Sequence, residues 1–295
     1  MCGRTACTRA PGEIADACSY RSNGGKTSKP QWKSAGGNAY NPSYNKGPKS
    51  CSPILLKNKF FSSENEDLSE RILLPMQWGL VPSWHKGDPK KFSFNMINCR
   101  CDTLTEKKSF MNALEKGQRC IVLADGFYEW KVNGKEKQPY YIQLKGSDKL
   151  PAESKPMLSM AGLFDKQISE EGELYTYTVI TVDASSSVQW LHHRMPAILD
   201  SEDDISQWLN VDTIPWKKAL DLLKPKNCLE WYPVSSVVNN VRNNTEDCVK
   251  KIDLVKEAAK KARSGQLMSA WLKKGEKRKS SEVNEDETEK KKLSK

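Results

Sequence analysis

The sequence predicts an α+β fold, with one domain built on a mixed, mostly antiparallel sheet and flanked by short helices. Apolar runs rich in β-branched and aromatic residues recur along the chain, whereas segments with helical periodicity are fewer and shorter. At 295 residues the chain is long enough to bury a core without disulfides or a structural metal. Strands punctuated by short helices are typical of an antiparallel sheet with helices at its margins.

Local patterns place the individual elements. β-Branched and aromatic content predicts strands at residues 119–124, 140–144, 158–163 and 175–182. Apolar spacing predicts helices at residues 106–115, 201–209 and 216–223. Ser201 is a suitable N-cap for the second helix, because its hydroxyl can accept a backbone N–H and the acidic residues after it complement the helix dipole.

Two polar regions interrupt or follow the predicted domain, which spans residues 1–250. Residues 22–38 are rich in Gly, Ser and Lys, so a long surface loop is expected there. Residues 251–295 are expected to form a charged, largely disordered tail, with a helix candidate at 250–263. Within this tail, the apolar island 266–272 fits either a docking peptide for a partner or a turn packed on the domain.

The charge of the chain favours a polyanionic partner. The formal net charge is +10, and residues 273–295, with nine basic and six acidic residues, carry only part of it. A basic folded part favours nucleic acid, bound with an affinity that falls as salt rises, although a generally basic soluble surface has the same composition. The short basic run 277–279 fits a nuclear-import signal, so a nuclear location is expected.

Membrane proteins and metalloproteins fit the sequence poorly. No apolar run approaches the roughly 18 residues of a membrane span. No apolar leader that would direct the chain to an oxidising compartment is expected, so most of the nine cysteines should be reduced. The cysteines lack CxxC pairs, and the adjacent His192 and His193 point to opposite sides of an extended chain, which argues against a metal site. No metal or other cofactor is expected.

Cys2 offers the most distinctive chemistry. Removal of Met1 would leave Cys2 with its α-amino group and its thiol on adjacent carbons. The amine, with an ordinary pKa of about 7.7–8.0, can form a Schiff base with an aldehyde, and the thiol can then close a five-membered thiazolidine. Neither group alone gives so stable an adduct. On the dipeptide alone, a small buried residue is the competing interpretation.

Two further residues are candidates for proton transfer and hydrogen bonding. Glu129 lies just beyond a predicted strand among aromatic residues, where apolar surroundings raise the pKa of a carboxyl and suit it to general acid/base catalysis. A solvent-facing Glu on a hairpin is the alternative. His192 lies at the edge of a loop where an imidazole can donate a hydrogen bond, or where it has no chemical role.

A cluster of aromatic and hydrogen-bonding side chains fits single-stranded or distorted nucleic acid. Aromatic rings stack on bases, Arg binds phosphates, and an amide can bind polar edges. Each ring alone also fits a core position. The cluster comprises Trp78, Trp84, Phe92, Phe94, Asn98 and Arg100.

Taken together, the motifs resemble the SOS-response-associated peptidase (SRAP) family over about residues 1–248. No single motif is specific, but the ordered set is. The motifs occupy residues 1–4, 78–84, 98–100, 126–130, 192–196 and 235–240. One departure lies at 98–103, where relatives often carry Asn-Ala-Arg-Ala-Glu-Thr and this chain adds the thiols of Cys99 and Cys101.

The resemblance implies a sensor of abasic sites in single-stranded DNA, at replication forks and at single-strand to double-strand junctions, that crosslinks to the lesion. It implies that Cys2 is the nucleophile and that Glu129 shuttles protons. His192 would hydrogen-bond the opened sugar, and Asn98 would position Cys2 and the lesion. The implied DNA-contacting residues are Arg4 and Arg100 for phosphates, with Trp84, Phe94 and Trp78 near the bases. The implied fold is one domain with a bifurcated sheet that contains a small barrel.

Three hypotheses for function follow. The first is a DNA–protein crosslinking enzyme, with an autopeptidase activity that releases Met1, although a methionine aminopeptidase would give the same product. The second is a thiol peptidase that uses Cys2, Glu129 and His192 on other proteins. The third is a non-covalent reader of modified cytosine, such as 5-hydroxymethylcytosine, in DNA. A monomer is expected, and residues 266–272 loosely resemble a sliding-clamp docking peptide.

Overall fold

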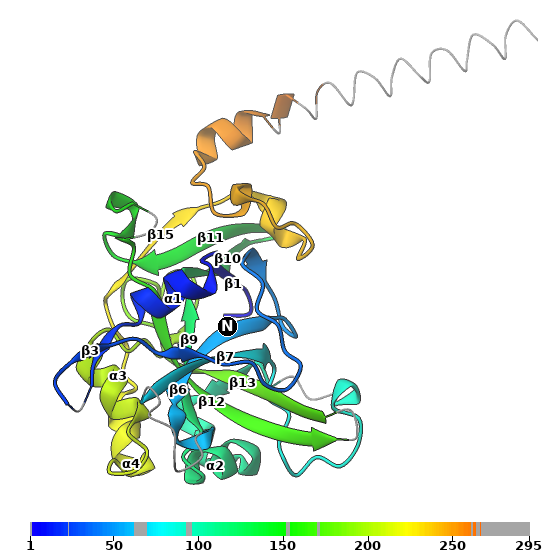
Figure 1. The fold of residues 1–295 in the computed structure, drawn as a ribbon. Helices are drawn as coiled ribbons and strands as arrows, with labels where there is room; N and C mark the ends of the chain where they lie inside the picture. The colour runs from blue at the N-terminus through cyan, green and yellow to red at the C-terminus, as the bar shows by residue number, and fades with distance from the viewer. Residues whose placement is uncertain are drawn as a thin grey trace, which may run out of the picture. The chain divides into compact units, whose positions relative to one another are not determined.

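Five strands close into a small barrel in the computed structural model (Figure 1). The order around the barrel is β13, β12, β9, β6, β7 and back to β13, and the closing pair β13–β7 is the only parallel one among these five pairings. β-Branched and large apolar side chains from all five strands fill the main core. The strands are β6 (Cys51–Lys57), β7 (Arg71–Trp78), β9 (Arg119–Ala124), β12 (Leu158–Ser169) and β13 (Gly172–Asp183).

The structure describes residues 2–22, 24–61, 70–92, 96–151, 154–169, 172–260, 262, 263 and 266. The chain divides into two compact units, residues 1–251 and 252–295. Within the described residues, no helix is long and apolar enough to span a membrane. The second unit contains a helical segment at 254–260, and residues 267–272 of the apolar island lie outside the described part.

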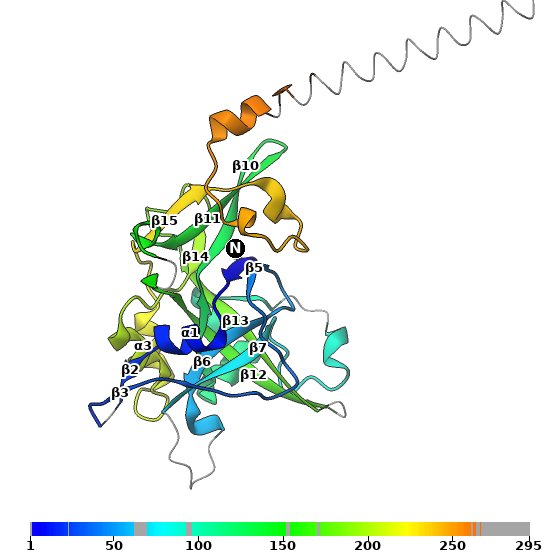
Figure 2. The same ribbon diagram turned by 45° about the horizontal axis from the view of Figure 1, so that its top comes forward.

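A second sheet has five strands. It lies next to the barrel, as Figures 1 and 2 show. Its order is β15, β11, β10, β1, β5, and all its pairings are antiparallel. Only Asp125 separates β9 of the barrel from β10, so one nearly continuous segment serves both sheets and produces the predicted bifurcation. The strands are β1 (Thr5–Cys7), β5 (Ser43–Lys46), β10 (Gly126–Asn133), β11 (Glu136–Leu144) and β15 (Leu229–Pro233).

Two short strands flank β13 and bring distant motifs together. β8 (Asn98–Arg100) pairs with β13 in parallel, with Asn98 opposite Val179. β14 (Arg194–Pro196) pairs with β13 in antiparallel fashion, with Arg194 opposite Asp183. The 98–100 and 192–196 motifs therefore meet at the same end of β13.

The helices are short, as predicted, and α2, α3 and α4 lie at the end of the barrel away from the second sheet (Figure 1). They are α1 (Pro11–Ala17), α2 (Lys108–Glu115), α3 (Glu202–Leu209) and α4 (Trp216–Ala219), the last continued by a 3₁₀ turn at Leu220–Leu222. Ser201 caps α3 as expected, since its hydroxyl accepts the Asp204 N–H at 3.1 Å. The predicted helix at 106–115 starts later because residues 101–106 form a 3₁₀ turn.

Two sequence-based expectations need correction. Residues 22–38 are not simply a loop, because the hairpin of β2 (Tyr20–Arg21) and β3 (Thr27–Ser28) is followed by β4 (Gln31–Trp32), which pairs with β7. Glu129 is not beyond a strand end but inside β10. The polar residues of β10 interrupt its apolar pattern, so the sequence does not predict a strand there.

Candidate active site

Strand β1 holds Cys2 beside Glu129. Thr5 lies opposite Phe127 in the antiparallel β1–β10 pair, and the Tyr128 N–H donates to the Arg4 carbonyl at 2.9 Å. The chain before β1 therefore continues alongside β10 toward Glu129. Cys2 is only 1% exposed, and its Sγ lies 3.9 Å from the Arg4 carbonyl oxygen. Thr5 and Phe127 lie far apart in the sequence, and the pairing of their strands creates this site.

Burial governs the protonation of Cys2 and Glu129. Loss of hydration raises the pKa of the Cys2 thiol, and the negative charge of Glu129 raises it further. Burial also raises the pKa of the Glu129 carboxyl. A neutral S–H group therefore lies close to a carboxyl that holds its proton more tightly than an exposed Glu does. Such a pair is suited to exchanging protons during a reaction.

Asn98 connects β8 to the Cys2 backbone. Its Nδ2 donates to the Cys2 carbonyl oxygen at 2.8 Å. The Trp78 indole N–H donates to the Ile97 carbonyl at 2.9 Å, which anchors the residue just before β8. The Asn98 Oδ1 is buried and has no hydrogen-bond partner within the described residues. That oxygen is a ready acceptor for a ligand that reaches the site.

Two backbone groups of Arg194 lie next to His192 Nδ1. The Arg194 N–H lies 2.9 Å from Nδ1 and the Arg194 carbonyl oxygen lies 3.2 Å from it. The shorter contact favours the tautomer in which Nδ1 accepts a hydrogen bond and Nε2 carries the ring proton. Burial lowers the pKa of this imidazole, which favours the neutral form. His192 is therefore set up as a neutral hydrogen-bond donor through Nε2.

Arg194 is a part of the site to which the sequence assigned no role. Its side chain is 3% exposed and donates to the Thr181 carbonyl at 2.6 Å. It forms ion pairs with Asp183 at 2.7 Å and Asp102 at 3.3 Å. Arg100 hydrogen-bonds the same Asp102 carboxylate, and this bond lowers the pKa of Asp102 to about 2. The ionised Asp102 thus joins β8 to β14. The position of Arg194 in the 192–196 motif is the sequence feature that could have pointed to this role.

Arg4 is tied into the domain by the last sequence motif. Its Nη1 donates to Asn45 Oδ1 at 2.7 Å and to the Val238 carbonyl at 2.9 Å. The Asn45 amide in turn donates to three backbone carbonyls, those of Val238, Asn240 and Asn243. The 235–240 motif thus supplies carbonyl groups that hold β1 and β5 in place. No sequence motif marks Asn45, because a single Asn has no pattern that distinguishes it from other polar residues.

The predicted DNA-contacting residues fall in different environments. Arg100 is exposed, and Trp84, in the loop after β7, is 50% exposed. Phe94 lies outside the described residues. Trp78 requires a correction, because it is fully buried and stacks on Tyr177 with a centroid distance of 6.1 Å. Trp78 belongs to the core and has no free face for a base.

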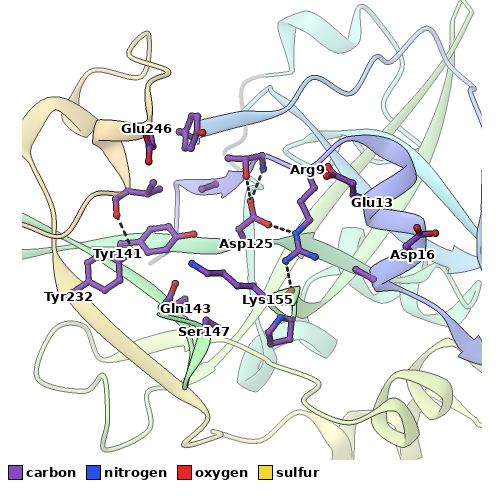
Figure 3. Close-up of a pocket in the computed structure, with 16 residues that line it drawn as sticks. Arg9, Glu13, Asp16, Asp125, Tyr141, Gln143, Ser147, Lys155, Tyr232 and Glu246 are labelled. Atoms are coloured by element: carbon purple, nitrogen blue, oxygen red, sulfur yellow. Dashed lines mark hydrogen bonds and ion pairs between the residues drawn. The ribbon is translucent and has the colours of Figure 1, made fainter. Parts of the chain in front are cut away.

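A cavity of about 680 Å³ lies on the opposite face of the second sheet from Glu129. Glu129 pairs with Tyr140, whereas the cavity is lined by Tyr141, which points to the other face. Figure 3 shows Arg9 joined to Asp125 and to the Lys155 backbone carbonyl in the cavity. The Arg9 Nε lies 3.4 Å from the Asp125 Oδ1. The cavity is therefore separate from the Cys2 site.

Cysteine and histidine side chains give no metal centre in the described part of the chain. All nine cysteines lie there and each is free. Among the described residues, no group of three or more His, Cys, Asp or Glu side chains has the arrangement to hold a metal ion. Cys99 is buried, and burial raises the pKa of its thiol, whereas Cys101 is half-buried.

The order of the motifs and the fold agree with one family model. The model for SOS response associated peptidase (SRAP) matches residues 1–241. The chain belongs to the SRAP family. This SRAP chain is 47% identical over 286 residues to "Abasic site processing protein HMCES" from Xenopus tropicalis, covering 92% of this chain and 85% of the relative. A second relative of the same name, from Gallus gallus, is 46% identical over 92% of this chain and 84% of its own length.

The chain is also similar to two bacterial proteins at lower sequence identity. "Abasic site processing protein YoqW" from Bacillus subtilis is 37% identical over 214 residues, 71% of this chain and 86% of the relative. A crystal structure of a protein from Bacteroides thetaiotaomicron superposes with a TM-score of 0.65 and 25% identity, covering 85% of this chain and 100% of that one. The SRAP fold of this chain thus has an experimentally solved counterpart.

Proposed function

We propose that this SRAP protein processes abasic sites in single-stranded DNA by forming a covalent crosslink through Cys2 once Met1 has been removed. The observation that carries the proposal is the placement of Cys2 beside the buried Glu129, with the Asn98 amide on the Cys2 carbonyl at 2.8 Å. The names of the vertebrate and bacterial relatives support the choice of substrate. The positive net charge of the chain supports a DNA partner.

The proposed reaction joins both groups of Cys2 to one carbon of the lesion. The α-amine attacks the aldehyde carbon of the ring-opened deoxyribose, and the resulting hydroxyl accepts a proton and leaves as water to give a protonated C=N bond. Sγ then adds to the same carbon as the thiol gives up its proton, which replaces the one used to release water, and the five-membered thiazolidine closes with an N–H. The net reaction combines aldehyde and aminothiol with release of one water molecule, so no redox cofactor is required.

Glu129 is proposed to move the protons in both steps. In its protonated form, favoured by burial, the carboxyl donates a proton to the departing hydroxyl. The resulting carboxylate then accepts the proton of the Cys2 thiol as Sγ adds. The raised pKa of that thiol means that a nearby base is needed, because little thiolate forms unaided.

His192 and Asn98 are proposed to orient the reacting groups. The neutral His192 donates through Nε2 to a hydroxyl of the opened sugar without adding charge to the site. Asn98 fixes the Cys2 carbonyl, which limits rotation of the residue that carries both nucleophiles. Arg100 and Arg4 are proposed to bind phosphates of the flanking strand, and the exposed Trp84 to contact a flanking base.

The free aminothiol requires hydrolysis of the Met1–Cys2 peptide bond. We propose that the Cys2 thiol and Glu129 catalyse this hydrolysis, with one water molecule consumed and free methionine released. Translation of the wild type and of Glu129→Gln in a system without methionine aminopeptidase tests this step. Intact mass should show loss of Met1 from the wild type only. Retention of Met1 in both proteins would assign the step to a separate enzyme.

A denaturing gel tests the proposed crosslink. Met1-free protein is incubated with a single-stranded oligonucleotide that carries one abasic site, and Cys2→Ser serves as the matched variant. A tetrahydrofuran analogue of the abasic site, which has no aldehyde, serves as the DNA control. A heat-resistant shifted band is expected only for wild-type protein with the natural lesion. Reversible binding without any such band would contradict the crosslink and favour a non-covalent reader of modified cytosine.

A further inference from the structure

A cluster of three aromatic rings lies beside the candidate active site. The rings of Trp190 and Trp231 are 4.4 Å apart at their centroids, and Tyr140 packs edge-on against both, at 5.0 Å and 5.7 Å. Tyr140 is buried, Trp190 is half-buried, and Trp231 is 41% exposed. Most large aromatic side chains of this domain are covered, so a Trp ring presented to solvent on a rigid base is a notable surface feature.

The strand registers place this cluster on the same face of the sheet as Glu129. Glu129 lies directly opposite Tyr140 in the β10–β11 pair, and residues opposite each other point to the same side. Trp231 lies opposite Ile142 in the β11–β15 pair, two residues from Tyr140 and therefore on that side too. Trp190 is two residues before His192. The rings thus extend the surface of the site from Glu129 and His192 outward.

The charges around the cluster suit an anionic strand. The Lys131 ammonium lies 5.4 Å from the centroid of the Trp190 ring. Residues 184–190, which carry Trp190, include no acidic side chain. Glu230 is the acidic neighbour of Trp231 on β15, but it alternates to the other face of the sheet and accepts a hydrogen bond from Gln143 at 2.9 Å.

The Trp231 ring is fixed in position although it is partly exposed to solvent. The Trp231 indole N–H donates to the Ser187 carbonyl at 3.0 Å, which fixes the ring against the 184–190 segment. Trp190 and Tyr140 support it from beneath through the ring contacts. A preorganised flat apolar surface next to a cation is the arrangement that proteins use to stack unpaired bases without sequence preference.

We propose that Trp231 is a stacking site for an unpaired nucleobase that flanks the abasic nucleotide. This inference rests on the proposed function, because it places the base on the strand that enters the Cys2 site. Its ligand is a base of single-stranded DNA, and its role is to hold the strand so that the abasic sugar lies against Glu129 and His192. No base-specific contact is required, so binding is independent of sequence.

Binding to an undamaged single-stranded oligonucleotide tests the stacking site separately from the crosslink. Trp231→Ala and Trp231→Leu are compared with Trp231→Phe and wild type by fluorescence anisotropy at one fixed salt concentration. The Ala and Leu variants should bind roughly 5- to 100-fold more weakly, and Phe, which keeps a ring, should bind nearly as wild type. Trp216→Ala on α4, which lies at the end of the barrel away from the second sheet (Figure 1), is the matched control and should leave the Kd unchanged.

The fluorescence of a base analogue distinguishes stacking on Trp231 from a purely structural role of this residue. 2-Aminopurine beside the abasic site should lose fluorescence when it stacks on wild-type protein, and should stay bright with Trp231→Leu. Thermal melting confirms that each variant is folded, and Leu provides an apolar replacement if Ala lowers the Tm. Wild-type affinity and wild-type quenching in folded Trp231→Leu would overturn the inference while leaving the crosslink intact. Loss of affinity in this variant, with no crosslink in any protein, would retain the stacking site and reject the proposed function.

Discussion

The Asn98 side-chain amide donates a hydrogen bond to the Cys2 backbone carbonyl at 2.8 Å. This bond joins the chain before β1, in the second sheet, to β8, which pairs with the barrel strand β13. The hydrogen bond therefore links the two sheets at Cys2, the residue proposed to react. The position of Cys2 depends on the relative placement of the sheets and not on its neighbours in sequence.

Replacing Asn98 with Ala should slow crosslinking more than it weakens DNA binding. The variant loses the bond that orients Cys2, and a hydrogen bond of this kind is worth about 1 kcal/mol, or roughly a fivefold change in rate. Loss of the buried Asn98 Oδ1 as a ligand acceptor would increase the effect. Single-turnover crosslinking at saturating protein measures the rate of reaction, and fluorescence anisotropy measures the Kd for DNA, so the two effects are separated. Equal losses in rate and affinity would show that Asn98 acts mainly in binding.

Replacing Glu129 with Gln should raise thermal stability at neutral pH. The native carboxyl has a raised pKa, so the folded state binds more protons than the unfolded state between the ordinary Glu pKa and the raised value. The free energy of unfolding of the wild type therefore falls as the pH rises from the ordinary Glu pKa to the raised pKa of Glu129. The Tm difference between Glu129→Gln and wild type should be positive at pH 7 to 8 and shrink toward about pH 4.

The same substitution at the exposed Glu136, on the strand paired with β10, is the matched control for this stability experiment. Its Tm difference should change little with pH. A Tm difference for Glu129→Gln that is constant across the pH range would contradict the assignment of a raised pKa to Glu129. Crosslinking by Glu129→Gln should fall by roughly 100-fold or more, the usual contribution of a general acid/base.

His192 should act through Nε2 in its neutral form. Gln places its amide near the position of Nε2, whereas Asn reaches only to the position of Nδ1, so His192→Gln should retain more crosslinking activity than His192→Asn. The lowered pKa predicts that the imidazole stays neutral until the pH falls below about 6.5. Nitrogen-detected NMR titration checks the tautomer and the midpoint. A protonated Nδ1 at pH 7, or a midpoint above 6.5, would be incompatible with this role.

Gly126 should be required at the point where the barrel passes into the second sheet. A Cβ at this position would collide with the Tyr141 ring and would lie 2.6 Å from the Ile142 carbonyl oxygen. Gly126→Ala should therefore lower stability by about 1–3 kcal/mol or more. Gly12, in α1, has no atom within 4 Å of such a Cβ, so Gly12→Ala should be neutral or stabilise by up to about 1 kcal/mol. Urea unfolding compares the two, and equal effects would refute the packing argument.

The sequence predicts the strands and helices that are marked by a pattern within a few consecutive residues. Residues 119–124 and 175–182 are rich in apolar and β-branched residues and lie within β9 and β13. Ser201 caps the N-terminus of α3, because its hydroxyl accepts a backbone N–H. Strand β10 was missed because Glu129 and Lys131 interrupt its apolar residues. A buried carboxyl within a strand has the same local pattern as an exposed one, and only the fold distinguishes them.

The candidate site depended on contacts that no local pattern encodes. The β1–β10 pairing brings Cys2 to Glu129, and the β8–β13 pairing brings Asn98 to the Cys2 carbonyl. The same limitation explains Trp78, whose sequence context fits both a base contact and a core position. Its burial against Tyr177 follows from the parallel β13–β7 pair that closes the barrel.

Mass spectrometry of the crosslinked N-terminal peptide tests the central claim most directly. Met1-free protein is allowed to react with abasic single-stranded DNA, digested with nuclease and protease, and treated with a thiol-alkylating reagent without any reductant. The thiazolidine predicts a peptide beginning at Cys2 that carries the sugar remnant, with one water lost in the coupling and neither the α-amine nor Sγ able to react further. A sugar remnant on another residue, or an alkylated Cys2 thiol in the crosslinked peptide, would contradict it.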